Sequence, residues 1–191
     1  MGCAADCGRD DPAPLGRSVS FADGQVSPDQ ARIADALPAL LGPTTRILHV
    51  GVGCSDLALR FAPRVARIDG VTIMPDERDV AEALGLPNYR VLTMDKHARA
   101  FAALPGPYDL LIDNNPGSFA CCVKHFEYTM RRYRDLLAPG GRLLTEARGA
   151  AWRQAGGISL RWRHWAAEGR KLGLTAEHVD GTVWALRKDH A

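Results

Sequence analysis

The stretch Arg46-Ile-Leu-His-Val-Gly-Val-Gly-Cys-Ser-Asp56 joins a short apolar run to a glycine turn and a helix start. The apolar run, residues 47–50, is typical of a buried strand. Two glycines follow it at once, and glycine lets the backbone turn sharply and approach a ligand closely. A helical pattern then covers residues 56–61. The stretch therefore predicts a strand–loop–helix unit with a ligand site in its loop.

The same alternation of strand and helix continues along the chain. Further strands are expected at 67–73, 89–93, 108–112, 142–145, 174–179 and 182–186, and further helices at 27–41, 76–84, 121–137 and 159–172. This alternation favours a parallel sheet covered by helices, and Asp180-Gly181 is a hairpin signal between the last two strands. The predicted fold class is α/β: a doubly wound, mainly parallel seven-stranded sheet with helices on both faces and a C-terminal antiparallel hairpin.

The length of 191 residues suits one domain with a full hydrophobic core. Residues 1–26 are rich in Gly, Asp and Pro and have no periodicity, so they are interpreted as a flexible N-terminal leader. Ser27 followed by Pro28 is a good helix start, with serine as the cap and proline in the first turn. We therefore expect a single folded domain over residues 27–191.

The charge balance argues against nucleic-acid and membrane-surface partners. There are 24 basic and 22 acidic side chains, for a formal net charge of +2. No apolar run approaches the roughly 18 residues that cross a bilayer, and the first residues lack the layout of a secretory signal. We expect a cytoplasmic protein that acts on a small molecule. The sequence leaves a homodimer open.

Five cysteines are an odd number without a disulfide-like framework. Cys3 and Cys7 have no His or Cys partners nearby at metal-ligand spacing. Cys121 and Cys122 are adjacent at an expected helix start, and such neighbours rarely bond to each other. The cysteines are interpreted as reduced side chains packed as small hydrophobes, and no metal site is predicted.

The glycine loop favours a cofactor without phosphate groups. In the dinucleotide-binding pattern G-x-G-x-x-G the third glycine would fall at Asp56. A carboxylate there would repel a pyrophosphate at the helix N-terminus. The loop also lacks the lysine of a phosphate-binding P-loop.

In this loop the chain resembles the class I S-adenosylmethionine-dependent methyltransferases. That family has an acidic residue in an apolar strand followed by G-x-G-x-G; here the acidic position is His49 and the last glycine is Ser55. The resemblance implies a Rossmann-like domain over 27–191 that binds S-adenosylmethionine. It places Gly51 and Gly53 against the methionine part of the cofactor. It also implies that His49 and Ser55 contact the cofactor, although a structural role for His49 stays open.

The next strand end, Asp69-Gly-Val-Thr-Ile-Met-Pro-Asp-Glu77, resembles the second motif of this family. There an acidic side chain binds the ribose hydroxyls of the cofactor, and Thr72, followed by Ile73, occupies the aligned position. Thr72 can still donate and accept a hydrogen bond. Asp76 and Glu77 follow, and a preference of acids for a helix N-terminus explains them equally well.

Met94-Asp95 follows the third strand. In the family an aspartate at this place accepts a hydrogen bond from the adenine amino group, and the apolar residue before it lies against the ring. The resemblance therefore implies that Met94 and Asp95 bind the adenine.

The fourth strand runs into Asp113-Asn-Asn-Pro-Gly-Ser-Phe119. In the family this edge faces both the sulfonium and the acceptor, which makes Asp113 and Asn114 candidates for catalysis and Asp113 also for cofactor binding. His125 and Tyr128 begin the next helix and are further catalytic candidates. Phe21 and Trp152 are expected to cover the site.

The resemblance implies methyl transfer from S-adenosylmethionine to a small-molecule acceptor. Residues 113–119 and 136–144 also resemble the spermidine synthases, which share the fold and transfer an aminopropyl group. Non-methylating chemistry therefore stays an alternative, either aminopropyl transfer or cyclisation of the cofactor on itself. A non-catalytic module that binds the cofactor or regulates a partner is the third alternative.

Overall fold

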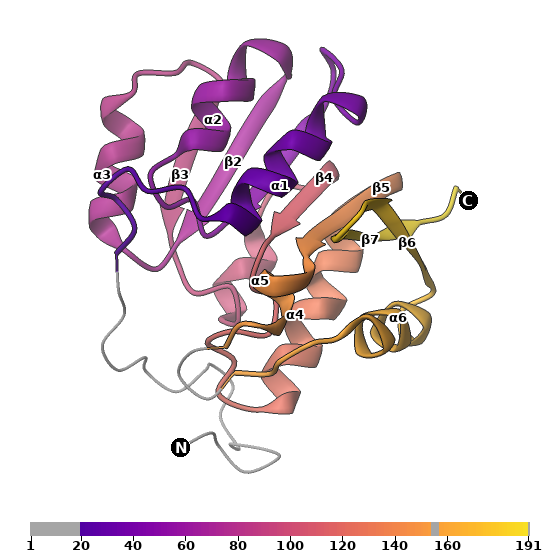
Figure 1. Ribbon diagram of the computed structural model, residues 1–191. Helices are drawn as coiled ribbons and strands as arrows, with labels where there is room; N and C mark the ends of the chain where they lie inside the picture. The colour runs from indigo at the N-terminus through magenta and orange to yellow at the C-terminus, as the bar shows by residue number, and fades with distance from the viewer. Residues whose placement is uncertain (1–19, 154–156, 191) are drawn as a thin grey trace.

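A seven-stranded sheet in the order β3-β2-β1-β4-β5-β7-β6 runs through the molecule (Figure 1). The computed structural model describes residues 20–153 and 157–190. The strands are β1 (Arg46–Val50), β2 (Arg67–Thr72), β3 (Tyr89–Thr93), β4 (Tyr108–Asp113), β5 (Leu137–Glu146), β6 (Leu174–Asp180) and β7 (Val183–Lys188). Strands β1 to β5 are parallel, and β7 lies antiparallel between β5 and β6. The predicted fold class, including the C-terminal antiparallel hairpin, is confirmed.

Helices cover both faces of this sheet (Figure 1). They are α1 (Pro28–Ala36), α2 (Asp56–Phe61), α3 (Pro75–Ala83), α4 (Val123–Leu136), α5 (Ala147–Ala151) and α6 (Trp162–Lys171), with 3-10 turns η1 (Leu37–Ala39), η2 (Ala62–Arg64) and η3 (Arg99–Ala103). One buried apolar cluster packs α1 and α2 against the sheet and includes Ile33 and Phe61. A second packs α4 and α6 and includes Tyr133 and Trp165. Burial on both faces explains why the central strands are almost wholly apolar.

Strands β1 and β4 lie side by side, with Val50 opposite Asp113. The chain leaves β1 toward β2 and β3 on one side, and leaves β4 toward β5 on the other. The loops after these two strands therefore diverge, and such a reversal of strand order leaves a crevice at the carboxyl ends of the strands.

The start of α1 forms as predicted. The Ser27 side chain accepts a hydrogen bond from the backbone N–H of Gln30, and the Gln30 side chain accepts one from the backbone N–H of Ser27. This reciprocal capping box satisfies two of the amides that a helix start leaves without partners. The capping box therefore defines the first residue of helix α1.

Several element boundaries differ from the sequence prediction, and one helix was not predicted; for example, the last helix, α6, begins at Trp162 rather than at residue 159. Strand β5 begins at Leu137 rather than Arg142, because Leu137 already pairs with Tyr108 and a register shift then takes up the irregular Pro-Gly-Gly segment. Helix α4 begins at Val123 rather than Cys121. The short helix α5 was not predicted; the Glu146 carboxylate caps its first amides.

Residues 1–19 of the expected leader, with Cys3 and Cys7, lie outside the described residues. Residues 20–26 contain turns and bends and no helix or strand. Phe21 nevertheless contacts the domain, since its backbone N–H donates to the Glu77 carboxylate at 3.0 Å. None of the helices in the described ranges is long and apolar enough to span a membrane.

Asp69, the first residue of the stretch that resembles the second motif, is a structural residue of β2. Its carboxylate is fully buried and accepts hydrogen bonds from Arg67 at 2.9 Å, Arg90 at 2.5 Å and the Tyr108 hydroxyl at 2.8 Å. These contacts join three strands, β2, β3 and β4. A buried carboxylate is tolerated only when it is paired in this way.

Asp69→Ala is therefore expected to lower the free energy of unfolding by about 3–5 kcal/mol, because the substitution leaves two arginines and a buried hydroxyl without their shared partner. Urea denaturation measures the change. Asp79→Ala is the matched control, since Asp79 pairs with Arg78 on an exposed helix surface and should change stability by less than about 0.5 kcal/mol. Equal effects of the two substitutions would contradict the assignment.

Candidate functional site

A cavity of about 340 Å³ lies at the carboxyl ends of β1 to β4. Its walls come from the loops that follow these strands: Gly51 and Gly53, residues 71–74 with Glu77, residues 94–96, and residues 113–115. The volume lies within the range of about 300–1,000 Å³ found for small-molecule sites. The four strand ends that the sequence singled out therefore meet around one space.

The glycine loop forms the first wall. Gly51 and Gly53 have φ values of 80° and 50°, and Ser55 also adopts a left-handed φ of 63°. This conformation is natural for glycine and uncommon for serine. The Ser55 hydroxyl is buried against the Tyr89 hydroxyl at 2.9 Å and does not line the cavity. The structure thus brings Gly51 and Gly53 to the cavity, and places Ser55 behind the loop.

His49 lies inside β1, away from the main cavity. Burial lowers its pKa from 6.5 to about 4, against the opposing effect of the Asp113 charge, so the ring is neutral at pH 7. Its Nδ1 and the Asn114 Oδ1 have no hydrogen-bond partner among the described residues. Both residues line a second cavity of about 30 Å³, which has room for a water molecule bonded to both.

Glu77 supplies the acidic group at the second strand end. The Thr72 hydroxyl donates to Glu77 Oε2 at 2.5 Å, and the Phe21 backbone N–H donates to Glu77 Oε1 at 3.0 Å. Glu77 is 3% exposed, yet it lines the cavity together with Thr72 and Ile73. It stands in the first turn of α3, where the partial positive charge of the helix N-terminus stabilises a carboxylate.

Met94 and Asp95 form the next part of the wall, as the sequence predicted. Asp95 Oδ1 accepts a hydrogen bond from the His97 backbone N–H at 2.8 Å. This bond fixes the carboxylate at the start of the loop after β3. The second oxygen keeps its capacity to accept from a ligand.

Asp113 ends β4 in a buried ion pair with Lys96, whose Nζ lies 2.7 Å from Asp113 Oδ2. The same oxygen accepts from the Tyr133 hydroxyl at 2.6 Å, and the other oxygen accepts from the Asn115 backbone N–H at 3.0 Å. Burial, followed by the Asp113 charge, raises the pKa of Tyr133 well above 10, so the phenol stays protonated and donates. Asp113 is thus held in place by three donors.

Asn114 lines the cavity from the loop after β4. Its amide donates to the Asp29 carboxylate, and its backbone carbonyl accepts from the Thr145 hydroxyl at 3.1 Å. Gly149 packs so closely that a Cβ there would lie 2.1 Å from the Asn114 side-chain oxygen. Asn114 therefore presents the Asp29 carboxylate to the cavity from the first turn of α1.

His97 ties the loop after β4 to α4. Its Nδ1 lies 2.6 Å from the Thr129 hydroxyl, and its Nε2 lies 3.1 Å from the Ser118 carbonyl. A carbonyl only accepts, so Nε2 carries the proton and Nδ1 accepts from Thr129. Burial, and next the Lys96 charge, lower the pKa of His97 from 6.5 to about 4.

Aromatic side chains cover the cavity, as predicted for Phe21 and Trp152. Both line it and are partly exposed, at 47% and 39%. Trp152 meets Phe119 edge to face, with ring centroids 6.0 Å apart. A cover of this kind excludes water from a ligand without enclosing the site.

The other two catalytic candidates lie on α4, outside the lining of the cavity. His125 Nδ1 is 3.2 Å from the sulfurs of Cys121 and Cys122. The Tyr128 ring is covered by the Arg132 guanidinium, 5.6 Å from its centroid. The structure does not bring either residue to the cavity.

Several charged residues of the cavity were missed by reasoning from the sequence. Glu77 was explained equally well as part of a helix start, and the sequence did not predict Asp29, Lys96 or Arg148 as site residues. A lysine next to Asp95 after a parallel strand was a usable signal, because a buried strand-end carboxylate such as Asp113 needs a cation. Asp29 had no signal, since only the tertiary fold brings α1 to Asn114.

No family model and no curated protein match the sequence. The fold is similar to that of the N-methyltransferase NodS from Bradyrhizobium japonicum in complex with S-adenosyl-l-homocysteine, with a TM-score of 0.61 and 16% identity over 84% of this chain and 87% of that one. It is similar to SAM-bound CalS10, an amino pentose methyltransferase from Micromonospora echinaspora, with a TM-score of 0.63 and 16% identity over 83% of this chain and 89% of that one. It is also similar to the [4+2]-cyclase SpnF, with a TM-score of 0.62 and 18% identity over 94% of this chain and 89% of that one. The chain therefore has the fold of the class I methyltransferases, as its motifs predicted.

The two buried histidines predict a loss of stability in acid. Their folded-state pKa values of about 4 lie below the unfolded value of 6.5, so protons bind the unfolded chain first. The stability they contribute is complete above pH 6.5 and is lost as the pH falls toward 4. We expect His97→Gln to remove about 3 kcal/mol of this pH dependence.

Urea denaturation of both proteins between pH 7.5 and about pH 4 measures this dependence. Subtracting one stability curve from the other removes the contribution of carboxylates that titrate in the same pH range, because both proteins contain them. His190→Gln, an exposed control, should leave the dependence unchanged. A parallel pair of curves for the His97→Gln and native proteins would show that His97 titrates alike in both states.

Proposed function

We propose that the cavity binds S-adenosylmethionine and that the protein transfers its methyl group to a small-molecule acceptor. The observation that carries this proposal is the meeting of four strand ends around one space, in the order of the family's motifs. Solved structures of this fold hold S-adenosylhomocysteine in NodS and SAM in CalS10. Their identities are low, so these structures support the proposal through the fold.

The charges of the cavity favour a cationic ligand. Among its described lining residues, the acidic side chains are Asp29, Glu77, Asp95 and Asp113, and the basic ones are Lys96 and Arg148. Lys96 is already paired with Asp113. A phosphate would be repelled by the excess of carboxylates, whereas a sulfonium is attracted to them. The balance therefore supports a cofactor with a positive centre and no phosphate.

Each part of the cofactor has a complementary group in this arrangement. Gly51 and Gly53 allow close approach of the methionine part to the backbone. Glu77 accepts from the ribose hydroxyls, and it takes this role in place of Thr72, which orients it. Asp95 accepts from the adenine amino group, and Met94 lies against the ring.

Methyl transfer needs little beyond alignment and removal of a proton. A lone pair of the acceptor forms a bond to the methyl carbon while the carbon–sulfur bond breaks, and its electron pair stays on sulfur. The acceptor then loses a proton. We propose that Asp29 receives it, because Asp29 lines the cavity and Asn114 orients its carboxylate.

A second candidate function is a reaction in which the cofactor donates no methyl group. The neighbour SpnF, named as a [4+2]-cyclase, shares this fold. Asp113 is also fully engaged by Lys96, Tyr133 and Asn115, so the strand-end acid is not presented as a base. Aminopropyl transfer and cyclisation of the cofactor belong to this second class.

Glu77→Gln and Asp95→Asn are each expected to weaken binding of S-adenosylmethionine by about 10- to 100-fold, because a hydrogen bond to a charged group contributes about 1.5–3 kcal/mol. Isothermal titration calorimetry measures the affinity. Glu82→Gln, on the exposed side of the same helix α3, is the matched control and should bind as tightly as the native protein. Native affinity in the two cavity variants would refute the proposed cofactor orientation.

Asp29→Asn is expected to lower the rate of methyl transfer by about 100-fold or more, as for loss of a general base, while calorimetry shows unchanged cofactor affinity. The assay incubates the protein with S-adenosylmethionine, alone and with a panel of amines and phenols, and identifies the products by mass spectrometry. S-adenosylhomocysteine that appears only with an acceptor supports methyl transfer. Methylthioadenosine without any acceptor supports the second candidate instead.

A further inference from the structure

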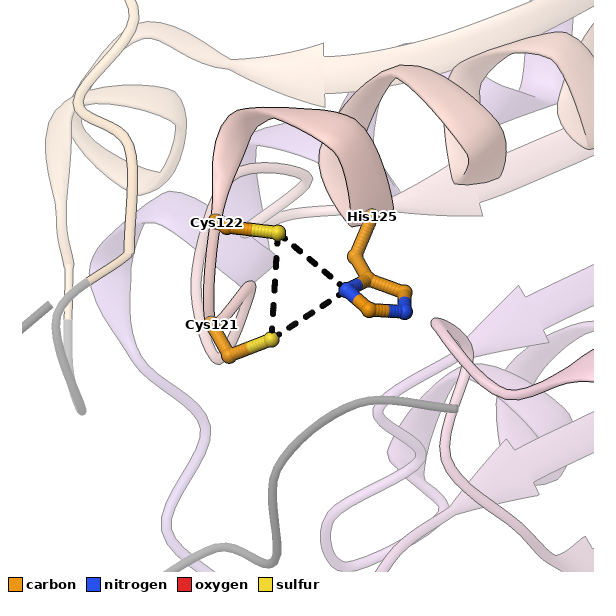
Figure 2. Close-up of side chains that lie close together, drawn as sticks. All are labelled: Cys121, Cys122 and His125. Atoms are coloured by element: carbon orange, nitrogen blue, oxygen red, sulfur yellow. Dashed lines mark hydrogen bonds between the residues drawn. The ribbon is translucent and has the colours of Figure 1, made fainter. Parts of the chain in front are cut away.

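Two cysteines and a histidine form a compact cluster at the start of α4 (Figure 2). His125 Nδ1 lies 3.2 Å from the sulfur of Cys121 and 3.2 Å from that of Cys122, and the two sulfurs are 4.0 Å apart. His125 and Cys122 are buried, at 3% and 6% exposure, while Cys121 is half-buried. The cluster therefore has one side open to the surface.

Hydrogen bonding alone accounts poorly for this convergence. A ring nitrogen carries either one proton or one lone pair, so His125 Nδ1 makes one good hydrogen bond in its own plane. Both sulfurs nevertheless lie equally close to it. A single metal ion would engage all three atoms at once, since thiolates and a neutral imidazole are all ligands of thiophilic cations.

The spacing of the three atoms matches a zinc site. With Zn–S near 2.3 Å and Zn–N near 2.0–2.1 Å, tetrahedral ligation places two sulfurs about 3.8 Å apart and a sulfur and a nitrogen about 3.6 Å apart. The observed separations of 4.0 Å and 3.2 Å lie within about half an ångström of these values. Small side-chain movements therefore suffice to place the three atoms around one ion.

The local backbone also suits metal binding by thiolates. Cys122 is the N-cap residue of α4, a helix of 14 residues. The partial positive charge at a helix N-terminus favours the thiolate form of a nearby cysteine. His125 stands in the first turn, so its ring and both sulfurs come from five consecutive residues.

We propose that Cys121, Cys122 and His125 bind one Zn²⁺ ion. Two thiols lose their protons on binding and the imidazole binds through its neutral Nδ1, so the step releases two protons for each ion from the fully protonated thiols. Three protein ligands leave one of the four zinc positions to a water molecule or another group. The site does not depend on the proposed cofactor.

The position of the cluster gives such an ion a structural consequence. Cys121 closes the loop after β4, which carries Asn114 and Phe119 into the cavity, and His125 belongs to α4. An ion across these residues would fix the end of that loop to the helix, next to the His97 bridge between Ser118 and Thr129. Zinc would thereby stiffen the acceptor side of the cavity.

The test uses the full chain, reduced and stripped of metal with a chelator. Titration with Zn²⁺ against a competing indicator is expected to show one tight site per chain. Co²⁺ in its place should produce a thiolate-to-cobalt charge-transfer band and the intense visible bands of a tetrahedral site. Cys122→Ser and His125→Gln should each weaken zinc binding by about 100-fold or more and remove the cobalt bands.

Cys54→Ser is the matched control, because Cys54 is a half-buried free cysteine outside the cluster; it should keep both the affinity and the spectrum. Circular dichroism of the metal-free variants checks the fold, and Cys121→Ser replaces Cys122→Ser if the latter unfolds. Zinc should also raise the Tm of the native protein and not that of the cluster variants. Absence of a tight site, or equal binding in the native and Cys122→Ser proteins, overturns the proposal.

Discussion

The buried ion pair between Lys96 and Asp113 is the interaction on which the cavity depends. Its atoms lie 2.7 Å apart, and both side chains are less than a tenth exposed. Either charge alone in that place would cost several kcal/mol, so each partner requires the other. Lys96 also donates to the Asn115 carbonyl, and Asp113 accepts from Tyr133. The pair thus joins the loop after β3, the end of β4, the loop beyond it and helix α4.

This arrangement separates the groups that build the cavity from the groups free to act in it. Asp113 has no oxygen left without a donor, and His97 uses both ring nitrogens to hold Ser118 and Thr129. Glu77, Asp95 and Asp29 line the cavity and keep lone pairs that can accept from a ligand, whereas Asp113, which also lines it, is held in the ion pair with Lys96. The Lys96–Asp113 ion pair and the His97 contacts hold the loops that form the walls of the cavity, and the other carboxylates line the same space. Such support by surrounding contacts is what holds a binding group in a productive geometry.

The sequence predicted the fold and the parts of the site that depend on local signals. Hydrophobic periodicity, turn residues and strand ends were sufficient to predict the sheet. Gly51 and Asp95, which the strand ends singled out, both line the cavity. The sequence pattern was insufficient for residues whose position relative to the cavity depends on tertiary contacts. His125 was predicted to face the acceptor because it begins a helix, but the helix turns it toward Cys121 and Cys122. Asp29 reaches the cavity through the packing of α1, which no local pattern encodes.

Thr72 and Glu77 show why alignment on a strand end missed the acidic group. The Thr72 hydroxyl donates to Glu77, so the strand end orients a carboxylate supplied from the following helix. At the position aligned with the acidic residue of the family motif the sequence has Thr72, but the acid that lines the cavity beside it is Glu77. The same carboxylate accepts the Phe21 backbone N–H, and Phe21 lies over Gly53, 3.6 Å from where a Cβ would stand there. In the proposed cofactor complex, the ribose hydroxyls and the Phe21 backbone N–H would share the Glu77 carboxylate, and occupation of the site would then be coupled to the position of the aromatic cover.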